Sequence, residues 1–209
     1  MVSFSSPSLV LRRGAAALFL LAVACQTAPP VTVTAQFTPA PAFATRTIAE
    51  VAVLPVEDGT PTGAAARHLT MMRQEVMRQL VDRLYTPLTS AAVDAGLGGV
   101  GKASPGESLL APANLQKMVG HAREDAVFAL RVERWDEARL AVDNRVVFQF
   151  QAAMVAKDGA PLWSGTIHGE VKAGGAGPAP FDRDGKARSC ASLAITEMLQ
   201  KLPMRTLAP

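Results

Sequence analysis

Apolar and polar residues alternate along three stretches in the second half of the chain, at residues 125–135, 145–157 and 162–172. A period of two is the pattern of a β-strand with one buried face. The first stretch begins apolar on both faces, as a central strand does. An Asp-Gly pair at residues 158–159 separates the second stretch from the third and favours a hairpin turn. Together these stretches predict an antiparallel meander.

The middle strand of this meander has one polar side. Phe148 and Phe150 alternate there with Gln149 and Gln151. Because amide side chains are rarely placed in an apolar core, we expect the side that carries the glutamines to meet solvent or a partner protein. Gln149 and Gln151 are therefore candidate partner-binding residues.

Helical stretches are marked by apolar residues that recur every three to four positions. A long amphipathic helix is predicted over residues 63–84 and a closing helix over residues 186–202, both packed on the sheet. Shorter helices are predicted at residues 91–97 and 113–123. Pro112 precedes the second of these, and proline suits the first turn of a helix.

Two further strands complete the predicted domain. Residues 47–56 are rich in β-branched and other apolar residues, and residues 85–89 form a short extended piece because Pro87 cannot continue a helix. The predicted order is β-α-β-α-β-β-β-α. Since helical crossovers join parallel strands and hairpins join antiparallel ones, the expected fold class is a single α/β domain with a mixed sheet and helices packed on it.

The first 25 residues have a different character. Arg12 and Arg13 precede an apolar run at residues 14–24, which ends at Cys25. This run rises only about 16 Å as a helix, about half of a bilayer's hydrocarbon core, so it is typical of a secretory signal. The sequence Leu-Ala-Val-Ala-Cys at residues 21–25 resembles a lipobox, in which cleavage precedes a cysteine that carries diacylglycerol. The alternatives are an ordinary cleaved signal with an incidental Cys25 and an uncleaved anchor.

The chain is thereby divided into four parts. Residues 1–24 are a predicted signal peptide, residues 25–46 a lipidated cysteine with a Pro/Thr/Ala-rich tether, residues 47–203 the globular domain and residues 204–209 a tail. An extended tether of this length spans up to about 60 Å. Gln26 differs from the Asp that retains enterobacterial lipoproteins in the inner membrane, so the expected location is the periplasmic face of the outer membrane.

Charge and cysteine content narrow the function classes. The net charge is only +3, and bases alternate with acids in the charged stretches, which does not support nucleic-acid binding. With Cys25 committed to lipid, Cys190 is the remaining thiol and no intrachain disulfide is expected. Cys190 is either a reactive thiol or, as its apolar neighbours favour, a buried residue on a helix face.

We recognise no catalytic or metal-binding pattern and predict no cofactor. The three histidines lie on different predicted elements, without the spacing of a metal site; they are His68, His121 and His168. Alternation places Ser164 and Glu170 on the same strand face as His168, where the three side chains point in parallel instead of converging.

Trp135 and Trp163 are candidate partner-binding residues, because tryptophan is enriched among the residues that dominate binding energy at interfaces. The alternative is core packing. That alternative is favoured for Trp163, at the opening of a strand, and both interpretations stay open for Trp135, which stands among charged residues.

Several short motifs together resemble one family. They are VAVLP at residues 51–55, YTPL at 85–88, EDAVF at 124–128 and DGAPLWSG at 158–165. On these residues the chain is similar to the outer-membrane lipoproteins typified by a neisserial vaccine-candidate antigen. It is more distantly similar to the curli secretion-channel lipoprotein, to activator lipoproteins of penicillin-binding proteins and to the amino-terminal domain of the Tol-Pal translocation protein. The resemblance covers residues 47–202 and is more specific for fold than for function.

The expected function is that of a non-catalytic lipoprotein, anchored to the membrane by lipid and assembled with envelope proteins or with copies of itself. An accessory to an oligomeric secretion channel is the first version and an activator of peptidoglycan synthesis the second. A lipoprotein that binds a small ligand or lipid beneath the loop at residues 96–108 is the alternative from another class. A hydrolase would need converging catalytic groups, which the sequence does not suggest.

Overall fold

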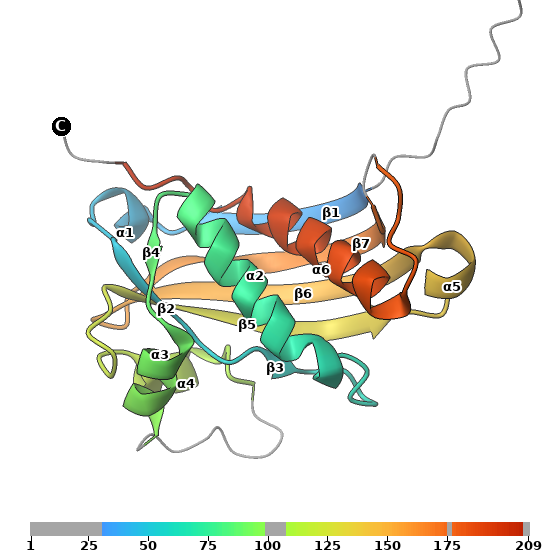
Figure 1. Ribbon diagram of the computed structural model, residues 1–209. Coiled ribbons are helices and arrows are strands. Elements are labelled where there is room, and N and C mark those ends of the chain that lie inside the picture. The colour runs from blue at the N-terminus through green and yellow to red at the C-terminus, as the bar shows by residue number, and fades with distance from the viewer. Residues whose placement is uncertain (1–30, 99–107, 175–176, 207–209) are drawn as a thin grey trace, which may run out of the picture.

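The computed structural model describes residues 31–98, 108–174 and 177–206. It is a seven-stranded sheet with helices on both faces (Figure 1). The strands are β1 Val31–Pro39, β2 Glu50–Val53, β3 Glu57–Asp58, β4 Thr86–Pro87, β5 Ala126–Asp136, β6 Arg145–Ala156 and β7 Pro161–Lys172. The helices are α1 Pro41–Ala44, α2 Leu69–Asp82, α3 Ser90–Leu97, α4 Pro112–Met118, α5 Leu140–Asp143 and α6 Arg183–Leu199, with a 3-10 turn at Ala66–His68.

The sheet is mixed, as predicted. Its strand order is β1-β7-β6-β5-β2-β4, with β3 beside β5. β2 pairs in parallel with β4 and β5, which follow it through helical crossovers, whereas the β5-β6, β6-β7 and β7-β1 pairs are antiparallel. The single mixed α/β domain expected from the sequence is confirmed.

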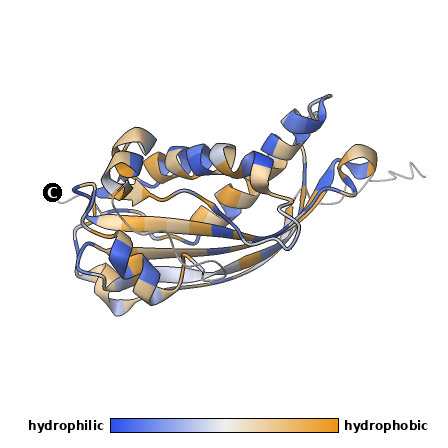
Figure 2. Ribbon diagram, turned by 90° about the horizontal axis from the view of Figure 1, so that it is seen from below, coloured by the Kyte–Doolittle hydropathy of each residue, from blue (hydrophilic) through white to orange (hydrophobic). Residues whose placement is uncertain are grey.

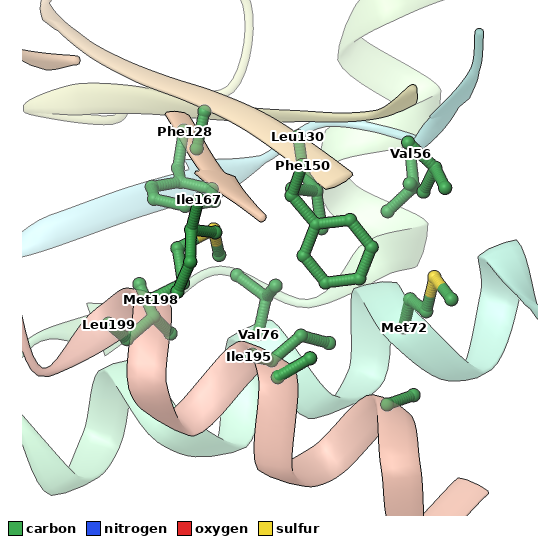
Figure 3. Close-up of a cluster of buried hydrophobic side chains, with 14 of the residues drawn as sticks. Val56, Met72, Val76, Phe128, Leu130, Phe150, Ile167, Ile195, Met198 and Leu199 are labelled. Atoms are coloured by element: carbon green, nitrogen blue, oxygen red, sulfur yellow. The ribbon is translucent and has the colours of Figure 1, made fainter. Parts of the chain in front are cut away.

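Helices α2 and α6 lie side by side across one face of the sheet (Figure 1). Between them and the sheet lies the larger core, in which Phe150 and Ile167 from the strands meet Val76 and Ile195 from the helices (Figure 3). A smaller cluster lies on the opposite face, where α3 and α4 cover residues of β2 and β5. Figure 2 shows the sheet from a second direction, with helical layers on its two sides.

The predicted tether at residues 25–46 is wrong where it overlaps the described residues. Val31–Pro39 form strand β1, which pairs along its whole length with β7 from Val31↔Val171 to Pro39↔Trp163. Alternation explains the pairing, because the apolar residues of β1 are partly buried against the core and its threonines are exposed. The described part of the folded domain therefore begins at Val31, and residues 26–30 lie between it and Cys25.

Two glycines of β7 allow β1 to lie close. A Cβ atom added at Gly165 would lie 2.0 Å from the carbonyl oxygen of Gln36, and one added at Gly169 would lie 2.1 Å from that of Thr32. Both obstructing atoms belong to the backbone of β1, so no side-chain rotation relieves the overlap. Beyond Gly165, Phe37 of β1 stacks on Trp163 with ring centroids 4.3 Å apart.

One predicted helix is shorter than expected. The helix predicted at residues 113–123 ends at Met118, because Val119 is extended and Gly120 adopts φ +85°. The buried carboxylate of Glu124 accepts hydrogen bonds from the backbone N–H groups of Gly120, at 2.5 Å, and Ala122, at 2.8 Å. Glu124 thus provides hydrogen-bond acceptors for the backbone N–H groups of the turn that replaces the last predicted residues of the helix.

Candidate functional site

Beyond the apolar cluster that α3 and α4 cover, the face of the sheet opposite α2 and α6 is polar over four strands. Register aligns Gln36, Thr166, Gln151 and Arg131 in one row across β1, β7, β6 and β5. A neighbouring row holds Thr34, His168, Gln149 and Arg134 in the same strand order. The predicted partner-binding glutamines thus lie at the centre of this polar face, and both are half-buried.

Ser164, His168 and Glu170 also lie on the polar face, each paired to a different residue of β1. As expected, they follow one another along one strand. Glu170 accepts bonds from the guanidinium groups of Arg139, at 2.9 Å, and Arg145, and it has no bond to the histidine. The arrangement presents hydrogen-bond donors and acceptors along one strand face, and these three residues do not form a catalytic triad.

Strand β1 forms one border of the sheet, and among the described residues no strand pairs with the outer row of its backbone groups. The N–H of Ala40 donates to the carbonyl of Leu162 in the β7 segment at 2.7 Å. Since antiparallel pairing alternates along a strand, the even-numbered residues of β1 face β7, and Val33, Ala35 and Phe37 direct their N–H and C=O groups outward. Such a row is a template for another strand.

Both tryptophans are buried, so neither is an exposed partner-binding anchor. Trp163 is 1% exposed and its indole N–H donates to the carbonyl of Lys201 at 3.1 Å. Trp135 is 3% exposed, lies over Phe150 with centroids 6.3 Å apart, and donates its indole N–H to Glu137 at 2.8 Å. Core packing was the favoured interpretation for Trp163 and proves correct for both residues.

Glu137 is the centre of an ionic cluster that sequence reasoning did not find. Its Oε1 lies 2.6 Å from His68 Nε2, and its Oε2 accepts hydrogen bonds from Arg183, at 2.9 Å, and from Arg67. Burial alone would raise the pKa of this carboxyl group. The bonds from Trp135, Arg183 and His68 and the charge of Arg67 outweigh burial and lower its pKa to about 2. At neutral pH Glu137 is therefore ionised and fully engaged, which suits a structural role better than proton transfer.

A cleft of about 580 Å³ opens beside this cluster. It is lined by the turn at residues 60–64, by the carboxyl end of β5 and by the first residue of α6. The β5 register shifts between Val132 and Arg134, and this irregularity lies next to the cleft. Asp58 accepts bonds from the N–H and hydroxyl of Thr60, so the turn is fixed by its own side chains.

A second cleft, of about 620 Å³, lies between α1 and the carboxyl-terminal segment. Tyr85 lines it and donates its hydroxyl to the carbonyl of Pro203 at 2.8 Å. Burial raises the pKa of Tyr85 to about 12, so this hydroxyl stays a donor. The ligand pocket expected beneath residues 96–108 falls largely outside the described residues.

The remaining candidate residues are separate from one another. His121 contacts the carbonyl of Lys117 at 2.9 Å, far in the chain from the other histidines. Cys190 is fully buried on α6, as favoured, and burial raises the pKa of its thiol to about 12. In the described parts of the chain, no group of three or more His, Cys, Asp or Glu side chains is placed to hold a metal ion. Cys25 lies outside those parts.

The part of the chain that the structure covers contains no helix with the length and apolarity needed to cross a bilayer.

No family model and no curated protein sequence matches the chain. Solved structures do match it. A variant of the PelC dodecamer from Paraburkholderia phytofirmans has a TM-score of 0.50 at 16% identity, covering 83% of this chain and 99% of that one. Lipoprotein GNA1162 from Neisseria meningitidis has a TM-score of 0.44 at 18% identity, covering 74% and 99%. The LpoB carboxyl-terminal domain from Salmonella enterica has a TM-score of 0.39 at 17% identity, covering 61% and 85%.

At these identities the likeness shows the fold alone. The resemblance to the neisserial lipoprotein, which the short motifs indicated, is confirmed as a distant structural similarity.

Proposed function

We propose that this chain is a lipid-anchored, non-catalytic protein of the periplasmic face of the outer membrane, which assembles with envelope proteins or with copies of itself. The proposal rests on the order of features along the chain. A cysteine in a lipobox-like sequence is followed, after five residues, by the border strand of the sheet. Lipid places Cys25 at the membrane, and β1 presents its unpaired backbone groups close by. Assembly as an accessory to a secretion channel is the first version of this role.

The polar sheet face supports the same role. Two rows of hydrogen-bonding side chains cross four strands there, and a polar surface of this breadth suits a protein partner better than a small molecule. The dodecameric state named for the PelC structure is consistent with assembly of this fold into rings or other oligomers. We therefore include self-association through β1 in the proposal.

Lipid anchoring is tested by Cys25→Ala. Removing the thiol removes the acceptor of the diacylglyceryl group, so the protein is expected to move from the outer-membrane fraction to the soluble periplasmic fraction. Cys190→Ala is the matched control, because that thiol is buried and should leave fractionation unchanged. Membrane fractionation that persists unchanged in Cys25→Ala would remove lipidation as the anchor.

Self-association through β1 is tested by Ala35→Pro, which removes an outward N–H while leaving the bonds to β7 in place. Native mass spectrometry of the detergent-extracted protein should show oligomers for the natural chain and monomers for Ala35→Pro. Thr34→Ala, on the polar face of the same strand, is the control for a general disturbance of β1 and should keep the oligomers. If Ala35→Pro protein still forms the oligomers, the proposal of self-association through β1 would be wrong.

The absence of catalysis is tested by incubating purified protein with generic ester, glycan and peptide substrates. Turnover that disappears on a single substitution, for example His168→Ala, would overturn this part of the proposal.

A further inference from the structure

Two large hydrophobic side chains project from the described part of the molecule. Phe181 is 102% exposed and Val142 is 83% exposed, more than any other large hydrophobic residue in the described ranges. Phe181 lies two residues before the start of α6, and Val142 lies on α5. Burial of an aromatic ring or a branched aliphatic group in an apolar phase is favourable, so these two exposed side chains would gain free energy from contact with one.

Both residues lie at one end of the sheet, the end where β1 begins. Val31 pairs with Val171, and Ala173 donates its N–H to the carbonyl of Asn144 directly after α5 at 2.7 Å. Figure 1 shows α5 and the first turn of α6 at this same end. We call this region, which carries Val142, Phe181 and the start of β1, the anchor end.

Chain length limits how far the anchor end can lie from Cys25. Because β1 begins at Val31, only five residues intervene, and a fully extended chain reaches at most about 20 Å over that interval. By contrast, β1 itself runs about 30 Å along the sheet. A lipid on Cys25 therefore holds the anchor end beside the bilayer and leaves the opposite end of the sheet in the periplasm.

Charge at the anchor end is mixed. Arg139 is paired with Asp143 and with Glu170, and Arg183 is paired with Glu137. Because these arginines already have carboxylate partners, they contribute little to the attraction of anionic lipids. Binding to a bilayer would therefore come from the exposed apolar side chains, with nearby charged groups at the level of the headgroups.

We propose that the anchor end rests on the membrane and inserts Phe181 and Val142 into the interfacial region of the lipid. This inference rests on the proposed lipid anchor at Cys25. It gives the domain a fixed orientation, in which the acyl chains and the two side chains bind the same leaflet. The polar sheet face is then roughly perpendicular to the membrane surface.

Tryptophan fluorescence tests the orientation with the full lipidated chain. The two native tryptophans are buried, so Phe181→Trp adds one exposed probe at the anchor end. Val81→Trp is the matched control, since Val81 is 55% exposed near the end of α2 that lies by the carboxyl terminus of α6. Vesicles are made of phosphatidylethanolamine and phosphatidylglycerol whose acyl chains carry bromine, a short-range quencher.

We expect at least twofold quenching of the added emission in Phe181→Trp, and none in Val81→Trp. A linker of about 20 Gly and Ser residues inserted before Val31 should weaken the quenching, because it lowers the effective concentration of the domain at the surface. Equal quenching of the two probes, or none of either, in protein that stays vesicle-bound would overturn the inference while leaving the lipid anchor intact.

A second copy of the chain is the competing occupant. It would shift the emission of the Phe181→Trp probe to shorter wavelength in the soluble double variant Phe181→Trp/Cys25→Ala without vesicles, in a way that depends on protein concentration. That result would also overturn the inference. Loss of vesicle binding is judged separately, by Cys25→Ala in the natural chain, and would instead remove the proposed function on which the inference rests.

Discussion

At the scale of single residues, Glu137 joins three distant parts of the chain. It links His68 before α2, Trp135 on β5 and Arg183 at the start of α6 through one carboxylate whose side chain is 8% exposed. The bonds are charge-assisted, which makes them stronger than neutral ones. Loss of the carboxylate leaves several polar groups without their acceptor, so Glu137 is a stabilising residue of the fold.

Glu137→Ala is expected to lower the free energy of unfolding by about 2 kcal/mol or more, because the buried indole N–H loses its acceptor and His68 loses its carboxylate partner. Chemical denaturation measures the change. Asp184→Ala is the control, since Asp184 is 77% exposed and lies 4.0 Å from Arg67, and it should change the free energy by about 0.5 kcal/mol or less. Similar losses in both variants would argue against a special role for Glu137.

Stability should also depend on pH through Glu137. Its pKa in the folded protein, about 2, lies below its ordinary value of 4.5, so the stabilisation is complete above pH 4.5 and is lost as pH falls toward 2. Thermal unfolding of the natural chain and of Glu137→Gln between pH 6 and pH 2.5 should show a difference in Tm that narrows with acidity. A constant difference would mean that the carboxylate charge does not contribute. Other carboxylates titrate equally in both proteins and cancel.

At the scale of elements, most strands and helices were predictable and β1 was not recognised. The meander and the long helix follow from apolar periodicity, which acts locally and is visible in the sequence. β1 carries the same alternation, Val-Thr-Val-Thr from Val31, but its proline-rich surroundings favoured a tether. The partners of Glu137 stand about 70 and 46 positions away in the sequence, and no local pattern can bring such residues together.

The close approach of β1 to β7 predicts a strong effect of a single methyl group. Gly169→Ala places a Cβ atom against the Thr32 carbonyl and the Val33 Cα, so β1 must shift or detach, at a cost of about 1–3 kcal/mol. Hydrogen exchange of the segment Val31–Pro39 should become faster, and Tm should fall. Gly177→Ala is the control, because the nearest atom to its added Cβ is 3.5 Å away. Unchanged exchange in β1 would show that the strand tolerates displacement.

At the scale of the whole molecule, the boundary of the domain follows from β1. Residues that composition assigned to a linker complete the sheet, cover Trp163 and place the amino terminus of the domain at the anchor end. The predicted domain, beginning at residue 47, would lack the partly buried apolar side of β1. The position of Cys25 relative to the fold therefore could not be obtained without the three-dimensional pairing.

Removing residues up to 46 should destabilise the protein, whereas removing residues up to 25 should not. Loss of Phe37 and its neighbours exposes apolar area worth about 3 kcal/mol or more and leaves β7 as an uncovered edge. Thermal unfolding, tryptophan emission and light scattering should show a lower Tm, a red shift and aggregation for the shorter protein alone. Equal Tm, emission and light scattering in the two proteins would mean that residues 31–46 do not contribute to the stability of the domain.

The pairing of β1 with β7 also has a mechanical consequence. When tension on the chain before Val31 is applied along the axis of β1, the hydrogen bonds of the antiparallel ladder lie perpendicular to the force. The ladder is thus loaded in shear, and its bonds share the force instead of breaking one after another from an end. Detachment of β1 by a pull along its axis is therefore resisted by the whole ladder. A force that lifts β1 sideways from the sheet would detach it most readily.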